Sequence, residues 1–224
     1  LNMNGWISSN YNKTFALDAN FGYETLFESG RDYTSYFYSL SPRLKLGDKF
    51  IMQYSFDYDM EKKERGYVQT LDNDDIIYGQ RDQETIINSI SASYNFNSFH
   101  ALNLTFRNYW STVTYENDLY ALQENGRLNQ ADGYTKVDID NPDVNFDTWN
   151  LDLSYSWQFA PGSQLTALYR NRLYNDTNAS KDDYFTSLND LFKEDINHVF
   201  SLRMVYYIDY NNVKNIFKSK PKNI

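Results

Sequence analysis

Residues 50–60 of the chain, FIMQYSFDYDM, alternate between apolar and polar side chains without interruption. Successive side chains on a β-strand point to opposite faces, so this pattern predicts a strand with one aromatic, apolar face and one polar face. A strand of this length spans about 35 Å at about 3.3 Å per residue, which is close to twice the usual strand length. That length is typical of a tilted strand crossing the hydrocarbon layer of a bilayer.

The same alternation recurs along most of the chain. Reading for period two predicts nine strands, at about 1–11, 13–26, 34–46, 50–60, 84–96, 100–114, 147–159, 163–174 and 198–210. Short turns alternate with longer polar loops near 27–33, 61–83, 115–146 and 175–197, as in bacterial outer-membrane barrels. We therefore predict an all-β fold, an antiparallel transmembrane β-barrel. Residues 1–210 supply its strands and loops, and residues 211–224 form a basic periplasmic tail.

Loop lengths also predict direction and completeness. We expect the long loops to be extracellular and the C-terminus periplasmic, in a bacterial outer membrane. The last strand then runs from the outside to the periplasm, and counting back through nine strands makes the first strand run in the same direction. A single-chain barrel has an even number of strands and both chain ends in the periplasm. We therefore expect the chain to be the C-terminal part of a larger, even-stranded barrel. The alternative is a large soluble β-sandwich or propeller with an aromatic core.

Composition excludes several other classes. No stretch approaches 18 consecutive apolar residues, which excludes a bundle of membrane-spanning helices. The net charge of −9 argues against nucleic acid as a partner, since nucleic acid requires a basic surface. The chain has no cysteine, so disulfides, thiol nucleophiles and thiolate metal sites are excluded.

The two faces of the predicted strands have different expected surroundings. Charged side chains facing lipid cost several kcal/mol near the bilayer midplane, so the charged face should line the lumen and the apolar face should contact outer-membrane lipid. The lumen residues either tune the selectivity of a pore or form a closed, salt-bridged interior, and both interpretations stay open. The predicted lumen-lining residues are Arg43, Lys45, Asp57, Asp59, Arg107, Asp152, Arg170, Arg172 and Arg203. The predicted lipid-facing residues are Phe50, Met52, Tyr54, Phe56, Tyr58, Trp149, Tyr155, Trp157, Phe159, Phe200, Met204 and Tyr206.

Other chemistry-bearing residues give weaker patterns. Asp138, Asp140 and Asp143 offer oxygen ligands that suit calcium, although a solvated acidic loop is the competing interpretation, and no other cofactor is predicted. His100 and His198 fall at opposite ends of the predicted strands, so they cannot form one site, and no catalytic residue is assigned. Apolar residues within 175–197 lie at helical spacing and predict a short amphipathic helix that plugs the pore, docks a partner or packs on the rim.

Four longer stretches carry a resemblance to a known family. They are NKTFALDANFGYETLFESGRDY, SPRLKLGDKFIMQYSFDYD, DDIIYGQRDQETIINSISASYNFN and NLDLSYSWQFAPGSQLTALYRNRL. Over most of residues 12–217 the chain resembles the C-terminal barrel region of Bacteroidota outer-membrane proteins that carry an N-terminal domain similar to family-nine carbohydrate-binding modules. The resemblance implies further strands, a sugar-binding-like domain elsewhere in the protein and carbohydrate as a ligand. It transfers no functional residue to this chain.

These patterns favour passage or handling of a solute at the outer membrane, with carbohydrate suggested by the resemblance. The alternative is a structural barrel that anchors an attached domain or joins partner proteins in a larger outer-membrane complex. A surface hydrolase that uses His198 is a third hypothesis, and a function other than an enzyme is favoured.

Overall fold

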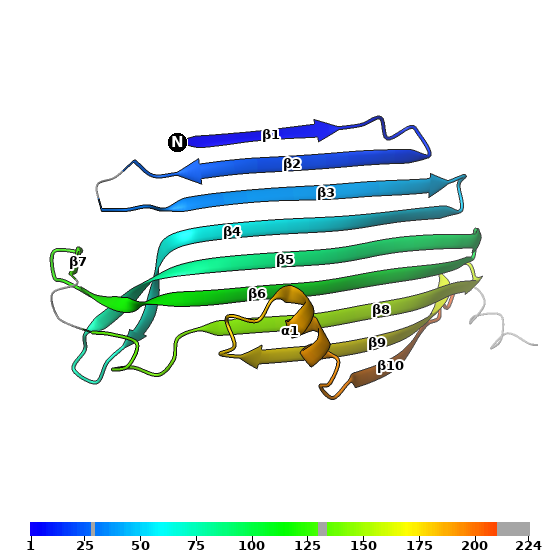
Figure 1. Cartoon of the computed structure of the whole chain (residues 1–224). Helices are drawn as coiled ribbons and strands as arrows, with labels where there is room; N and C mark the ends of the chain where they lie inside the picture. The colour runs from blue at the N-terminus through cyan, green and yellow to red at the C-terminus, as the bar shows by residue number, and fades with distance from the viewer. Residues whose placement is uncertain (28–29, 130–133, 210–224) are drawn as a thin grey trace, which may run out of the picture.

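The structure is a computed structural model that describes residues 1–27, 30–129 and 134–209. It is one antiparallel sheet in which strands adjacent in sequence lie side by side (Figure 1). A two-residue strand, β7 (Leu128–Asn129), pairs with β6 outside the main strand order, and the helix α1 spans Tyr184–Leu191. The main strands are β1 (Asn2–Ser8), β2 (Phe15–Thr25), β3 (Thr34–Leu46), β4 (Phe50–Thr70), β5 (Ile76–Asn97), β6 (His100–Leu122), β8 (Val144–Ala160), β9 (Ser163–Thr177) and β10 (Asn197–Val205).

The predicted all-β, antiparallel fold is confirmed, and each of the nine predicted strands corresponds to one main strand. The sheet is not closed. Within the described residues β1 pairs with β2 alone and β10 pairs with β9 alone, so each has one edge without a neighbouring strand. The part of the structure that is described contains no helix long and apolar enough to cross a membrane.

Tight turns join β3 to β4, β5 to β6 and β8 to β9, all at the same end of the sheet (Figure 1). Gly47 and Gly162 have φ values of 59° and 73° in two of these turns. A side chain at such positive φ is strained, so glycine lets the chain reverse within very few residues. We call this end of the strands the short-turn end. The opposite end, which carries the long connections and β7, is the long-loop end.

The predicted loop at 61–83 is wrong, because β4 and β5 continue through most of it and turn only at 71–75. A bulge at Lys63, whose φ is 54°, shifts the register between Glu61 and Glu64. Beyond the bulge, Glu64 and Arg81 form an ion pair across the two strands. Sequence pattern predicts a loop here for two reasons: the bulge interrupts the period-two alternation, and a run of charged residues is typical of a loop. The strands nevertheless continue through this segment.

The predicted loop at 115–146 is also too long, since β6 continues to Leu122. Here a small apolar core forms around Ile77, Leu119 and Ala121, which are 0%, 1% and 6% exposed. The partly buried residues around it are Val68, Leu71, Tyr134 and Ile139. The long-loop end therefore contains its own small apolar core. The predicted basic tail at 211–224 lies outside the described residues.

Candidate functional site

Strand pairing divides the sheet into two chemically different faces. Residues directly opposite each other on paired strands share a face. Phe56 lies opposite Leu40 and Asn88, and Asp57 lies opposite Ser39 and Ile87. Following these rows across the sheet assigns every strand residue to one of two faces. We call them the apolar face, which contains Phe56, and the polar face, which contains Asp57.

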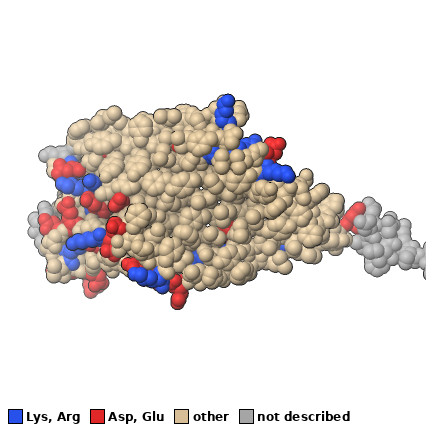
Figure 2. Space-filling model, turned by 45° about the vertical axis from the view of Figure 1, so that its right-hand side comes forward, with Lys and Arg blue, Asp and Glu red and all other residues tan. Residues whose placement is uncertain are grey.

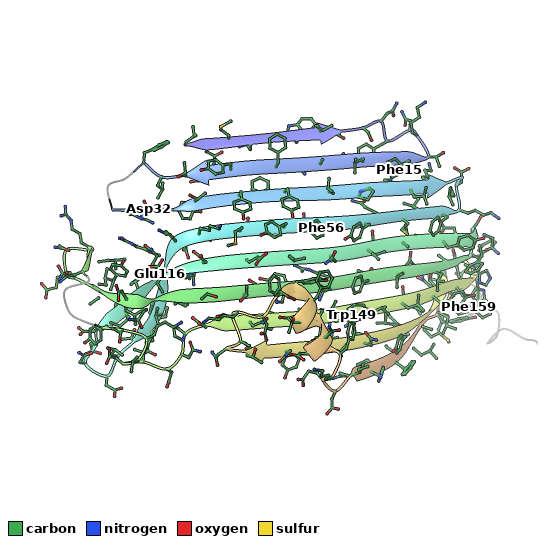
Figure 3. The ribbon with its side chains drawn as sticks, viewed as in Figure 1. Phe15, Asp32, Phe56, Glu116, Trp149 and Phe159 are labelled. Carbon is green, nitrogen blue, oxygen red and sulfur yellow. The ribbon has the colours of Figure 1, made fainter. Side chains whose placement is uncertain are left out.

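The apolar face carries a band of aromatic and aliphatic residues across several strands. On β8 the band runs from Trp149, beside α1, to Phe159 at the short-turn end, while Phe56 lies in the middle of the sheet (Figure 3). The face seen in Figure 2 is largely uncharged over its centre. Charged side chains gather mainly at the long-loop end, and a smaller group lies at the upper right of the view. Pairing places all the predicted lipid-facing strand residues on this face, and Tyr206 stacks on Phe159 at 6.2 Å. Their contact with lipid stays a prediction.

The nine residues predicted to line a lumen all share the polar face. Arg107 lies opposite Asn150, which lies opposite Arg172, so two arginines occupy one row. Asp152 and Arg170 are paired across β8 and β9, and two nitrogens of the guanidinium bind the two carboxylate oxygens, with Nε to Oδ1 at 2.6 Å. Such a two-point ion pair has the geometry that makes arginine–carboxylate contacts strong. Whether this face lines an open lumen stays a prediction.

The predicted helix within 175–197 is confirmed as α1. It lies on the apolar face and not on the polar face, so its position does not fit a plug of the predicted lumen. Phe192 packs edge-on against Trp149 with ring centroids 5.1 Å apart, and Tyr184 packs edge-on against Trp110 at 5.8 Å. Trp149, predicted to face lipid, is thus partly covered by the end of the helix segment.

A chain of hydrogen bonds fixes α1 to the sheet. The Tyr54 hydroxyl donates to Asn88 at 2.6 Å, and the Asn88 amide donates to the Tyr184 hydroxyl at 3.1 Å. That hydroxyl donates to Asn108 at 2.8 Å, and the Asn108 amide donates to Asp147 at 2.8 Å. These bonds join β4, β5, β6, β8 and α1 at the loop-side edge of the apolar band.

Sequence pattern missed this network although it left a signal. The apolar series on β6 is Leu102, Leu104, Phe106 and Trp110, and Asn108 interrupts it. An amide at an apolar position that is 1% exposed needs hydrogen-bond partners, and Tyr184 and Asp147 supply them. Interruptions of an otherwise regular apolar series therefore indicate where another element covers the sheet.

Two acidic side chains lie beside α1. Asp147 lies on β8 opposite Trp110, where it is 1% exposed and accepts a hydrogen bond from the Asn108 amide. One of its oxygens, Oδ2, has no hydrogen-bond partner among the described residues. Asp183 caps the N-terminus of α1, where the backbone N–H of Thr186 donates to it and lowers the pKa of its carboxyl.

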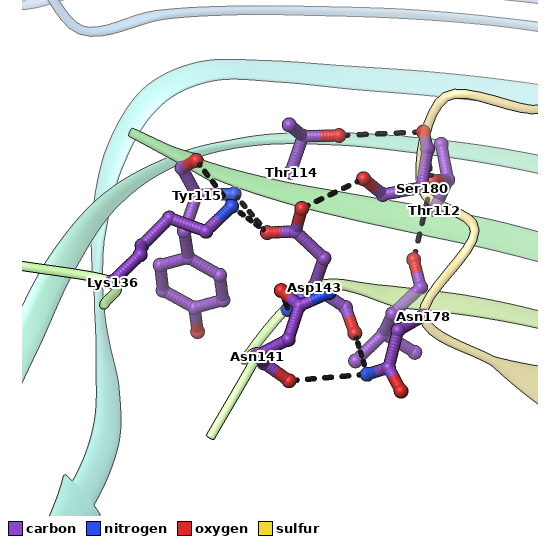
Figure 4. Close-up of polar contacts among 9 residues, drawn as sticks. Thr112, Thr114, Tyr115, Lys136, Asn141, Asp143, Asn178 and Ser180 are labelled. Carbon is purple, nitrogen blue, oxygen red and sulfur yellow. Dashed lines mark hydrogen bonds and ion pairs between the residues drawn. The ribbon is translucent and has the colours of Figure 1, made fainter. Parts of the chain in front are cut away.

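Asp143 forms the centre of a second polar cluster, which fastens two loops to β6 (Figure 4). Its carboxylate accepts hydrogen bonds from Lys136 Nζ at 2.7 Å, the Tyr115 backbone N–H at 2.9 Å and the Ser180 hydroxyl at 3.0 Å. Asn178 donates to the backbone carbonyl of Asp143. The Asp143 side chain is 9% exposed, so its charge is balanced by donors within the protein.

These contacts do not support the predicted calcium site. Asp143 is paired with Lys136, and Asp138 accepts two hydrogen bonds from Thr135, which lower the pKa of its carboxyl. In the described part of the chain no three acidic or histidine side chains are arranged to hold a metal ion. Asp140 is not brought to Asp143 by any contact of its side chain within the described residues.

The two histidines lie in separate places, as predicted. His100 stacks on Trp157 at 5.8 Å at the short-turn end. His198 lies opposite Asn171 on β9, and its Nδ1 is 2.9 Å from the Tyr169 hydroxyl. Within the described residues His198 has no hydrogen bond to a serine or an aspartate, which a serine-hydrolase arrangement requires.

Comparison with known proteins gives one match. No curated protein and no solved structure matches the chain. A family described as a domain of unknown function, DUF5916, matches residues 1–217, which is nearly the whole chain. The chain therefore belongs to the DUF5916 family.

Proposed function

We propose that the chain is part of a transmembrane β-barrel in a bacterial outer membrane and that its polar face lines a lumen through which a solute passes. One observation carries the proposal: strand pairing places nine charged residues on one face and a continuous aromatic band on the other. A charge facing lipid at the midplane costs about 2–4 kcal/mol, whereas it is tolerated in a lumen. A two-faced sheet of this kind suits lipid on one side and water on the other.

The dimensions of the apolar band support this environment. On β8 the band extends from Trp149 to Phe159. Ten residue steps at about 3.4 Å cover about 34 Å along the strand, and a tilt of about 45° reduces this to a height of about 24 Å. Outer-membrane barrels have an apolar band about 25 Å tall, flanked by aromatic residues.

The open edges of the sheet support a larger barrel. β1 and β10 each expose an unpaired edge within the described residues, and apolar side chains on both are exposed. Unpaired edges inside a bilayer leave backbone groups without hydrogen bonds, so further strands are required to close the barrel. We place the long-loop end outside the cell and the C-terminus in the periplasm, following the sorting of connections in such barrels.

Conductance measurements test solute passage. The protein, inserted into a planar lipid bilayer, should give discrete current steps, and sugars added to one side should reduce the current if carbohydrate enters the lumen. Carbohydrate rests on the sequence resemblance alone. Insertion that is verified by protease protection but gives no current steps and no sugar uptake by vesicles would contradict a solute pathway.

The open edges also favour a second candidate, a structural barrel within a complex. In that case strands or loops of partner proteins cover β1 and β10, and the charged polar face is a closed interior held by pairs such as Asp152 and Arg170. Such a barrel should co-purify with partners in fixed stoichiometry after mild detergent extraction. Recovery as a lone barrel that conducts would exclude this candidate.

A further inference from the structure

We propose that a hollow on the polar face binds a small anion that also carries hydroxyl groups, as a sugar acid does. The hollow lies at the short-turn end and has a volume of about 440 Å³. The inference rests on the proposed function. If the polar face lines a lumen, the hollow opens into that lumen, and the chemistry of its lining indicates which class of solute the lumen accepts.

The hollow is lined by residues of five strands, which is a broad base for a solute site. β5, β6, β8, β9 and β10 all contribute side chains to it. A volume of several hundred Å³ is the usual size of a small-molecule site and accommodates a single sugar ring with water. The lining polar residues are Asn95, Asn97, Ser98, His100, Ser156, Gln158, Ser163, Gln164, Thr166 and Arg203.

Several of these side chains have unused hydrogen-bonding capacity. Within the described residues Gln158, Gln164, Thr166 and Arg203 make no side-chain hydrogen bond or ion pair. A carboxamide offers both donors and acceptors, and a hydroxyl does the same. This combination matches the hydroxyl groups of a polyol, each of which needs a donor and an acceptor.

The charge of the hollow favours an anion over a neutral sugar. Among the described residues, its lining contains one arginine and no aspartate or glutamate, although the whole chain has a net charge of −9. A guanidinium presents donors in a planar fork that matches a carboxylate. Arg203 is therefore the group that would hold the acidic end of the solute, while Gln158 and Gln164 hold its hydroxyls.

Beyond the hollow, the polar face carries several arginines on β6, β9 and β10, whereas its acidic residues Asp57 and Asp59 lie on β4. Arg172 and Arg170 lie in neighbouring rows of the polar face, and Arg203 lies opposite Thr166, two rows farther toward the short-turn end. Arg107 shares the row of Arg172. Asp152 forms an ion pair with Arg170 and also attracts Arg172, which leaves Arg107 and Arg203 without a carboxylate partner among the described residues. A surface with one sign of charge raises the local concentration of the opposite ion. These arginines would guide an anion along the face to the hollow.

Binding to the purified protein in detergent tests the inference. We would titrate galacturonate and galactose, which differ in the carboxylate, into the native protein and into Arg203→Gln by calorimetry. Galacturonate should bind the native protein at least about tenfold more tightly than galactose, since only its carboxylate can accept a charge-assisted hydrogen bond from Arg203. Arg203→Gln should abolish this preference, whereas Gln164→Leu should weaken binding of both sugars.

Arg43→Gln is the matched control, because Arg43 lies on the polar face of β3, outside the hollow, and stacks over Tyr11. It removes the same charge and should leave binding unchanged. Equal binding of the two sugars, or full retention of the preference in Arg203→Gln, would overturn the inference. The titration measures binding alone, so it is independent of the conductance measurement. A protein that binds galacturonate but does not conduct would contradict the proposed solute pathway and leave the proposed binding site intact.

Discussion

Leu153 offers the sharpest test of which surface contacts lipid. It lies on the apolar face of β8, four residues from Trp149 and six from Phe159. With about 3.4 Å per residue and a tilt of about 45°, it lies about 10 Å and about 14 Å from the two edges of the band. Leu153→Arg should therefore lower the free energy of unfolding by about 2–4 kcal/mol, which changes the folded-to-unfolded ratio by about 30- to 700-fold.

Two matched substitutions isolate the effect of membrane depth. Leu165 lies opposite Trp157, near the short-turn edge of the same face, so Leu165→Arg should cost only about 0–1 kcal/mol. Ser154 is the next residue after Leu153 and lies on the polar face opposite Asn103, so Ser154→Arg should also cost little. Reversible urea unfolding in lipid vesicles measures all three differences.

The soluble alternative makes a different prediction for the same set. In a sandwich or propeller core, both leucines would be buried against protein and both arginine substitutions would be strongly destabilising. Equal costs for Leu153→Arg and Leu165→Arg, or a larger cost for Ser154→Arg, would refute the assignment of the apolar face to lipid.

Two further predictions concern the long-loop end. Asp147 is 1% exposed and accepts the hydrogen bond from the Asn108 amide, and Asn108 in turn binds Tyr184 of α1. Asp147→Ala should therefore lower the free energy of unfolding in urea by about 1–3 kcal/mol, and an unchanged free energy would contradict a role of this contact in holding α1 on the sheet. Asp143→Ala leaves the Tyr115 N–H without a partner and leaves Lys136 with the Tyr115 carbonyl but no carboxylate, so it should cost about 2–3 kcal/mol and make 134–143 sensitive to protease, whereas Asp140→Ala should change stability by less than about 0.5 kcal/mol. Equal effects of these two alanine substitutions would show that the Asp143 contacts do not hold the loops.

Local pattern was sufficient to predict much of the sheet. The strand at 34–46 has the predicted bounds, and the strand predicted at 50–60 begins at Phe50 as expected. Period-two alternation is a local property, so it identifies the strands and the residues that share a face. Closure is not local, because it depends on which strands meet β1 and β10. Alternation therefore predicts a sheet with two different faces, but it does not predict how the sheet closes into a barrel.

The errors have two physical causes. Charged residues after Met60 indicated a loop, but Glu64 and Arg81 neutralise each other across β4 and β5, so the strands continue. The position of α1 was not predictable, because helical spacing identifies a helix and not the face on which it packs. That face is set by contacts between residues distant in sequence, such as Tyr184 with Asn108.

The central claim is that one face of β4 contacts lipid and the other contacts water, and the absence of native cysteine makes it directly measurable. Single cysteines at 52–59, carrying nitroxide spin labels in the protein reconstituted in lipid vesicles, report exposure to oxygen, which concentrates in lipid, and to a water-soluble nickel complex. Labels at Met52, Tyr54, Phe56 and Tyr58 should be accessible to oxygen, and labels at Gln53, Ser55, Asp57 and Asp59 should be accessible to nickel. Accessibility that does not alternate, or nickel access at the aromatic positions, would contradict a membrane-spanning strand.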